Sequence, residues 1–99
     1  MTDPLIRAFV GADGRLTQWP SKRKKQLAAL CYLAQAFEPG RRYTESEVND
    51  IIDLKTCFHD PATLRRDLYD MGFLCREKDG SAYWCSDTPP TRAQLGLPE

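Results

Sequence analysis

The sequence predicts an α+β domain built from three main helices and a C-terminal β-hairpin. Apolar residues recur at three- and four-residue steps in three separate segments, each bounded by residues that start or stop helices. Asp79-Gly80 lies between two β-prone runs, which is the strongest short signal for a hairpin. The predicted order is helix, short strand, helix, helix and hairpin. This is the order of a winged helix-turn-helix domain, a fold that serves DNA, RNA and protein binding alike.

The first main helix is expected at about residues 22–37. Ser21 is a favoured N-cap, and Pro39-Gly40 stops the helix because proline cannot continue it. Its predicted buried stripe, widened by Leu33, consists of Leu27, Leu30, Cys31, Ala34 and Phe37. Upstream of it, residues 4–10 predict a short N-terminal helix that precedes a short extended segment.

The second helix, at about residues 45–55, is predicted from its start signal. Thr44 and Glu47 form a capping box, in which Thr44 accepts a hydrogen bond from the Glu47 amide and Glu47 reaches back. Tyr43 and Val48 occupy the staple positions around that cap.

The third helix is predicted to open at Asp60-Pro61, with the aspartate as the cap and the proline in the first turn. Leu64, Leu68 and Met71 form its inner stripe, and Gly72 is a natural C-terminal stop. In a winged helix this third helix enters the major groove of DNA.

The hairpin and the residues after it set the domain limits. Residues 73–78 and 81–85 are expected to pair across Asp79-Gly80, and a proline-marked segment follows them. The sequence therefore predicts one domain over residues 1–86 and a flexible C-terminal tail over residues 87–99.

Composition limits the classes of function. The chain has 99 residues, enough for one domain, and its fourteen Lys and Arg balance fourteen Asp and Glu. A neutral chain is not a general binder of polyanions. The longest uncharged stretch is too short and too mixed to span a membrane, and the N-terminus lacks the basic start and apolar stretch of a signal peptide. We expect a cytoplasmic protein without membrane contact.

The charges are unevenly distributed along the chain. Residues 1–43 carry eight basic and three acidic residues, whereas residues 44–72 carry three and seven. Four cations crowd the first turn of the first main helix, where the macrodipole favours anions, namely Lys22, Arg23, Lys24 and Lys25. Together with Arg41 and Arg42 they form a candidate site for nucleic-acid phosphates or another anion. The alternative is a solvated basic turn, since the unfavourable charge costs only about 0.3–1 kcal/mol.

The outward face of the third helix carries both signs of charge, with Arg65, Arg66, Asp67, Tyr69 and Asp70. Carboxylates beside arginines repel phosphate, which weighs against ordinary DNA readout. We expect Arg66 to pair with Asp70, four positions on, and Arg65 to meet a carboxylate of the second helix. Both arginines are then structural.

Tyr83 and Trp84 point to opposite faces of a strand. One is expected in the core, and the other on the surface as an interaction residue that docks a partner or stacks on a base. Two hypotheses remain open. The protein is a nucleic-acid-binding regulator that contacts DNA through its N-terminal basic face, or a module for protein interaction or dimerisation. A third hypothesis places an anionic effector at the first turn of the main helix.

Nothing in the sequence assembles for catalysis. It has no Gly-rich phosphate loop, no nucleophile elbow and a single histidine, so we expect a protein that is not an enzyme and needs no cofactor. Cys57, His59, Cys75 and Cys85 offer the donors of a Cys₃His zinc site, but their spacing matches no strong zinc pattern, and we expect no metal. The cysteines are expected to be reduced packing residues, although Cys75 and Cys85 approach one another in some hairpin registers.

Several strings of the sequence, taken together, resemble the bacterial domain-of-unknown-function family 2087. They are Gly14-Arg15-Leu16, Trp19-Pro20-Ser21-Lys22, Tyr43-Thr44-Glu45-Ser46-Glu47-Val48-Asn49, Leu64-Arg65-Arg66-Asp67-Leu68, Gly72, Arg76, Asp79-Gly80-Ser81 and Tyr83-Trp84. The resemblance extends from about Ile6 to Trp84. It implies a prokaryotic cytoplasmic protein and, because members occur alone or joined to helix-turn-helix regulators, a role in transcriptional regulation. It supplies no activity and no binding residues.

Overall fold

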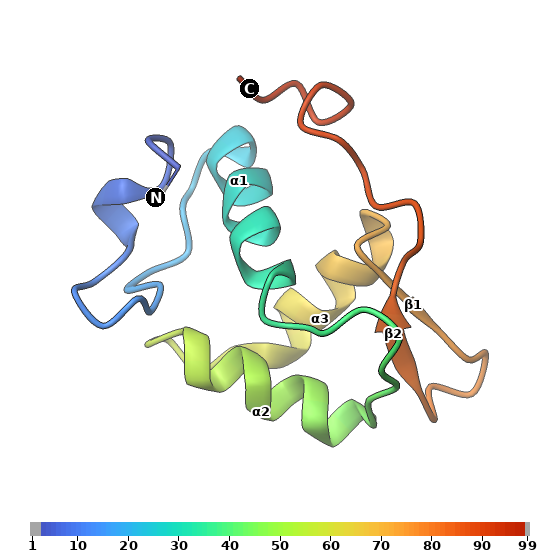
Figure 1. Ribbon diagram of the computed structural model, residues 1–99. Helices are drawn as coiled ribbons and strands as arrows, with labels where there is room; N and C mark the ends of the chain where they lie inside the picture. The colour runs from blue at the N-terminus through green and yellow to red at the C-terminus, as the bar shows by residue number, and fades with distance from the viewer. Residues whose placement is uncertain (1–2, 99) are drawn as a thin grey trace.

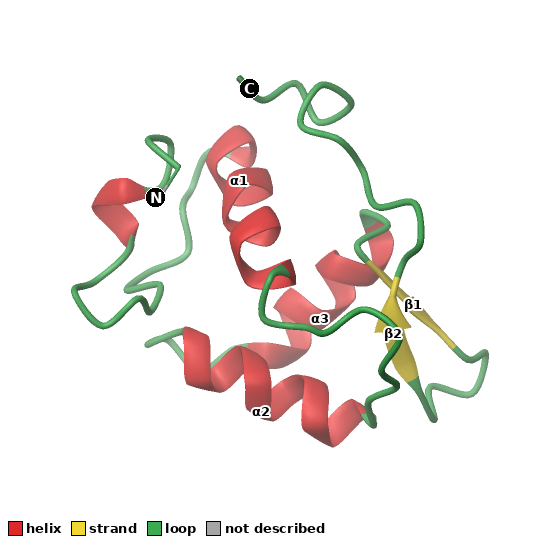
Figure 2. Ribbon diagram, viewed as in Figure 1, coloured by secondary structure: helices red, strands yellow, loops and turns green. Residues whose placement is uncertain are grey.

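The computed structural model describes residues 3–98, and its elements confirm the predicted fold class (Figure 1). A short 3₁₀-helix, η1 (Arg7–Phe9), precedes the helices α1 (Arg23–Ala34), α2 (Glu45–Lys55) and α3 (Pro61–Asp70). An antiparallel hairpin follows, formed by β1 (Leu74–Arg76) and β2 (Tyr83–Cys85). The helix α3 packs against both α1 and α2, and the hairpin continues from its C-terminal end (Figure 2). The result is a winged-helix-like α+β domain.

One core unites all of these elements. Fully buried side chains come from the N-terminal segment, the three helices and the hairpin, and include Ile6, Leu16, Leu30, Leu33, Val48, Ile52, Leu64, Leu68 and Leu74. Among the described residues, no helix has the length and apolar character needed to cross a bilayer.

The helix α1 differs from the prediction at both ends and in its buried face. Lys22, not Ser21, is the N-cap residue, and no side chain caps this end. After Ala34 the chain continues in tighter turns, in which each amide donates to the carbonyl three residues back. The buried residues are Ala28, Ala29, Leu30 and Leu33, whereas Leu27, Cys31 and Ala34 of the predicted stripe are only half-buried. Because α1 contacts other segments on several sides, its buried face is broader than a stripe.

The start of α2 is as predicted. The Thr44 hydroxyl accepts a hydrogen bond from the Glu47 amide at 3.1 Å, and the Glu47 carboxylate accepts one from the Thr44 amide at 2.8 Å. Tyr43 and Val48 are buried on either side of this capping box. At the other end of the helix, the Arg15 guanidinium donates to the carbonyls of Asp53 and Thr56. Arg15 is thus a C-terminal cap supplied from 38 residues away in the chain.

The helix α3 begins and ends where the sequence predicts. Asp60 occupies the N-cap position and Pro61 the first turn, but the Asp60 side chain makes no capping hydrogen bond. Gly72 adopts a φ of 88°, in the left-handed region. Its amide donates to the Tyr69 carbonyl at 3.1 Å, and the next amide, of Phe73, donates to the Leu68 carbonyl at 2.9 Å. These two bonds form a Schellman motif, which turns the chain from α3 into β1.

The hairpin has a longer connection than the sequence predicts. Its register pairs Leu74 with Cys85, Cys75 with Trp84 and Arg76 with Tyr83. The Gly80 amide donates to the Glu77 carbonyl at 2.9 Å, so the turn centres on Lys78-Asp79 and not on Asp79-Gly80. Gly80 follows that turn with a φ of 75°.

A third short segment pairs with the free edge of β2. The amide of Tyr43 donates to the Tyr83 carbonyl at 2.8 Å, and the amide of Tyr83 donates back to the Tyr43 carbonyl at 2.7 Å. This pairing ties the connection between α1 and α2 to the hairpin.

The C-terminal segment, expected to be flexible, folds back over the N-terminal side of the molecule (Figure 1). Leu97 is 5% exposed and belongs to the core, and Leu95 packs against that core. Arg92 forms an ion pair with Asp3 at 2.7 Å. These leucines therefore pack in the same core as residues 6–83, because the burial of leucine side chains away from water lowers the free energy of the folded chain.

Removal of the α2 cap tests its contribution to stability. We expect Thr44→Ala to lower the free energy of unfolding by about 1 kcal/mol, because the Glu47 amide loses its acceptor. Urea denaturation measures the change. Ser46→Ala, at an exposed position in the same turn, is the matched control and should change stability by less than about 0.5 kcal/mol. Equal losses in both variants would contradict the capping role.

The same capping box predicts a pH dependence. The hydrogen bond from the Thr44 amide lowers the pKa of Glu47 below its ordinary value. A lowered pKa in the folded state means that the carboxylate stabilises the fold above the pKa of the unfolded state, and that this stabilisation is lost as the pH falls through the folded-state pKa. Wild type should therefore exceed Glu47→Gln in stability at neutral pH, and the difference should vanish on acidification. Urea denaturation over an acidic pH series measures this, and a gap that persists at low pH contradicts it.

Candidate functional site

Polar contacts on both sides of the buried stripe of α3 hold this helix against its two neighbours, α1 and α2. Arg65 lies on the side of α2, where its guanidinium meets the Glu45 carboxylate at 3.0 Å and donates to the Asn49 side-chain carbonyl. Asp67 lies on the side of α1, where its two oxygens accept from the two terminal nitrogens of Arg23, each at 2.8 Å. The expected contact of Arg65 with an acidic residue of the second helix is confirmed.

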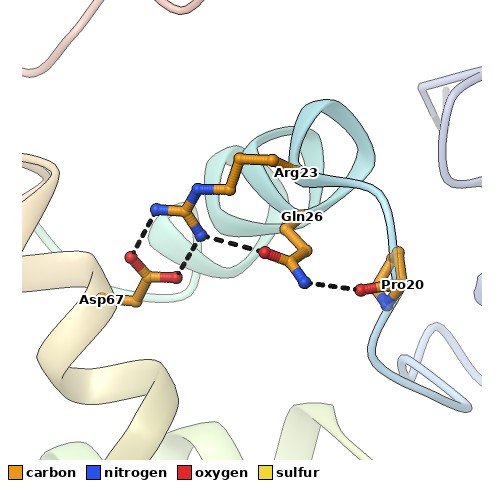
Figure 3. A network of polar contacts seen from close by, with 4 residues as sticks. All are labelled: Pro20, Arg23, Gln26 and Asp67. Atoms are coloured by element: carbon orange, nitrogen blue, oxygen red, sulfur yellow. Dashed lines mark hydrogen bonds and ion pairs between the residues drawn. The ribbon is translucent and has the colours of Figure 1, made fainter.

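The Arg23–Asp67 pair belongs to a chain of polar contacts that begins at the turn before α1 (Figure 3). Gln26 donates to the Pro20 carbonyl at 2.7 Å and accepts from Arg23 at 3.1 Å. The hydrogen bond with Asp67 raises the pKa of Arg23 above its ordinary value. Arg23, predicted to bind an anionic partner, is therefore already bound to a carboxylate of the protein itself.

The other predicted cations do not gather at one place. Lys22 and Lys24 are exposed at the first turn of α1, and the Lys25 ammonium lies 5.6 Å from the centre of the Phe9 ring. Arg41 and Arg42 follow the opposite end of α1, and a helix of twelve residues is about 18 Å long. The structure thus separates the predicted basic cluster into two groups.

The second of these groups is partly engaged by aromatic side chains. The Arg41 guanidinium lies 4.9 Å from the centre of the Tyr43 ring. Arg42 lies 4.6 Å from the centre of the Trp84 ring and pairs with Glu77 at 2.6 Å. Trp84 is half-buried beneath this arginine.

Tyr83 and Trp84 differ as the alternation along the strand predicts. Tyr83 is 3% exposed and belongs to the core, whereas Trp84 keeps part of its ring at the surface. Of the two predicted interaction residues, only Trp84 has a ring that is accessible at the surface.

The outward face of α3 carries two charged groups that the rest of the described chain leaves unpaired. Arg66 and Asp70 are both exposed, and the ion pair predicted between them is absent from the contacts of residues 3–98. Tyr69, beside them, is 40% exposed. Since Asp67 is neutralised by Arg23, the carboxylate that repels phosphate from this face is Asp70 alone.

A cavity of about 310 Å³ lies between α3, the start of α2 and the hairpin. Three arginines and two tyrosines line it together with two carboxylates, namely Arg65, Arg66, Arg76, Tyr69, Tyr83, Glu45 and Asp70. A second hollow of about 580 Å³ adjoins it, and both are bounded by Tyr69, Asp70 and Arg76.

Arg76 is the functional candidate that sequence reasoning missed. Its guanidinium lies 4.9 Å from the centre of the Tyr69 ring. Interactions with the hydroxyls of Tyr69 and Tyr83 raise the pKa of Arg76 above its ordinary value. In the sequence Arg76 is one of four alternating charges near the hairpin tip, and only the fold, which turns β1 back beside α3, places it against Tyr69.

The four cysteines are free thiols. Cys75 and Cys85 project from opposite faces of the hairpin, because Cys75 is opposite Trp84 and Cys85 is opposite Leu74. Burial raises the pKa of Cys31 and of Cys85 above the ordinary thiol value. Over residues 3–98, no three His, Cys, Asp or Glu side chains come together in a way that would hold a metal ion.

The three helices and the hairpin define a winged-helix-like domain. Its candidate recognition surface is the outward face of α3, which carries polar side chains. The chain belongs to the domain-of-unknown-function family 2087, described as uncharacterized proteins conserved in bacteria, whose model matches residues 15–85. This confirms the resemblance that the sequence motifs carry. The comparison with curated proteins found no match, and neither did the comparison with solved structures.

A double-mutant cycle on Arg23→Ala and Asp67→Ala measures the contact that holds α3 against α1. The Arg23 side chain is 50% exposed and that of Asp67 is 18% exposed, so solvent screens the pair. We expect a coupling energy of about 0.2–1 kcal/mol from urea denaturation of the four proteins. Additive single changes would show that the pair does not hold the helix. Lys24→Ala, in the same turn, is the control for loss of charge alone.

Proposed function

We propose that the protein is a nucleic-acid-binding regulatory domain that inserts the outward face of α3 into the major groove of DNA and acts by binding, without catalysis. The observation that supports this proposal is the bidentate contact between Arg23 and Asp67. It neutralises one of the two carboxylates that would repel DNA from α3 and leaves Arg66 exposed. A transcriptional role in the bacterial cytoplasm belongs to the same proposal.

The outward residues of α3 have the donors and acceptors that base recognition needs. Arg66 and Asp70 are four positions apart, so they lie on one helix face. An arginine donates in a fork to the O6 and N7 atoms of guanine, and an aspartate accepts from the amino group of cytosine. Thr63 is exposed one turn before Arg66, within reach of the same groove.

Phosphate contacts would come from the first turn of α1. Lys22 and Lys24 are exposed there, and Arg23 brings this turn beside α3. Because the formal net charge of the chain is zero, these few cations must supply the electrostatic attraction. The proposal therefore implies binding of moderate strength that depends on a small number of phosphates.

A protein-interaction or dimerisation module is the second candidate. Zero net charge favours it, as does Leu54 on α2, which is 72% exposed. Trp84 adds a half-buried aromatic ring on the outward side of the hairpin. Sedimentation velocity over a range of concentrations tests self-association, and a mass of one chain throughout would exclude a homodimer.

Fluorescence anisotropy with labelled duplex DNA tests the first candidate. We expect log K to fall with log[salt] with a slope of about −2 to −4, as for two to four neutralised phosphates. Arg66→Ala should weaken binding at least about fivefold, because a base contact is worth about 1–3 kcal/mol. Arg7→Ala, which removes an exposed arginine of η1, is the control and should bind as wild type does. A slope near zero, or equal binding by both variants, would rule out this use of α3.

A further inference from the structure

The cavity between α3 and the hairpin concentrates positive charge in a chain that is neutral overall. Three guanidinium groups line it, from Arg65 and Arg66 on α3 and Arg76 on β1. The carboxylates that line it are Glu45 and Asp70. Its volume of about 310 Å³ is at the lower end of the range for small-molecule sites.

The three arginines are not equivalent. Arg65 already forms an ion pair with Glu45 at 3.0 Å and donates a hydrogen bond to Asn49. Its side chain is only 13% exposed. Arg66 and Arg76 form no ion pair with any carboxylate in residues 3–98. Two exposed guanidinium groups that belong to different elements thus line one cavity, and neither is paired with a carboxylate of residues 3–98.

The Tyr69 ring on the cavity wall holds Arg76 in a position that suits a small oxyanion. The Tyr69 ring supports the Arg76 guanidinium at 4.9 Å, so that its planar fork is held against α3. Guanidinium forks match the oxygen geometry of phosphate, and charge-assisted hydrogen bonds of this kind are about twice as strong as neutral ones. Asp70 is the one unpaired carboxylate on the wall, and it opposes an anion.

We propose that this cavity binds a phosphate group, gripped by Arg66 from α3 and by Arg76 from the hairpin. The phosphate is that of a small phosphorylated molecule or of a nucleic-acid backbone, since the same two forks suit both. The site requires no DNA, so it goes beyond the proposed function. Asp70 sets its affinity by repulsion.

An NMR titration of the full ¹⁵N-labelled chain with inorganic phosphate, at constant ionic strength held with chloride, tests the site. We expect the Nε–H signals of Arg66 and Arg76 to shift together and to saturate. Arg76→Ala and Arg66→Ala should each weaken phosphate binding at least about tenfold, because a hydrogen bond to a charged group is lost. Asp70→Asn should tighten it several-fold, because the repelling charge is removed. Arg76→Lys, which retains the charge but not the fork, should also bind less tightly than wild type.

The controls separate this site from general attraction and from misfolding. Arg7→Ala should bind phosphate as wild type does, and the amide spectrum of each variant reports whether it is folded. If Arg76→Ala does not fold, Arg66→Ala decides, because Arg66 contacts no carboxylate of the described chain. Shifts that never saturate, or that spread equally to Lys22 and Lys24, would overturn the proposal.

A competing DNA duplex distinguishes the sources of the phosphate. Displacement of inorganic phosphate by DNA, together with weaker DNA binding by Arg76→Ala, places a backbone phosphate in the cavity and assigns Arg66 to that phosphate instead of to a base. Saturable phosphate binding without any DNA binding supports the site and contradicts the proposed function. DNA binding that neither competes with phosphate nor responds to Arg76→Ala supports the proposed function and overturns the phosphate site.

Discussion

The rotational setting of α3 is the constraint on which the rest of this structure depends. Its buried stripe consists of two leucines, Leu64 and Leu68, whose burial contributes about 1.5–3 kcal/mol each. A stripe this narrow leaves rotation of the helix about its own axis poorly defined. Arg65 on one flank and Asp67 on the other fix that rotation, because each must reach its partner on α2 or α1. These pairs lie near the surface and contribute little stability, but they determine which residues face outward.

The rotational setting of α3 decides which of its charged side chains remain exposed. By count, the chain is neutral and the third helix carries two arginines and two aspartates. In the structure, Arg65 and Asp67 form ion pairs with neighbouring helices. The charged residues left on the outward face of α3 are Arg66 and Asp70. The charges that remain exposed on α3 are therefore fewer than its sequence contains, because ion pairs between helices use one arginine and one aspartate of this helix.

The hairpin places a further arginine beside the outward face of α3. The Schellman motif at Gly72 turns the chain back beside α3, and the pairing of Arg76 with Tyr83 brings a guanidinium to the edge of the helix. The ring of Tyr69 then supports it from α3. Helix and hairpin thus share the walls of one cavity, and neither element forms a site on its own.

Local signals determined what the sequence by itself could show. The Thr44–Glu47 capping box, the stop at Gly72 and the order of the elements all follow from residues close together in the chain, since caps, turns and periodicity are short-range interactions. Local reasoning placed Asp60 correctly at the N-cap of α3, but the capping hydrogen bond expected of its side chain does not form. The Arg15 cap on α2, the Arg23–Asp67 pair and the position of Arg76 were decided only by the tertiary structure, because each joins groups far apart in sequence. Such contacts depend on how helices and strands are placed against one core, and no short stretch of sequence contains that information.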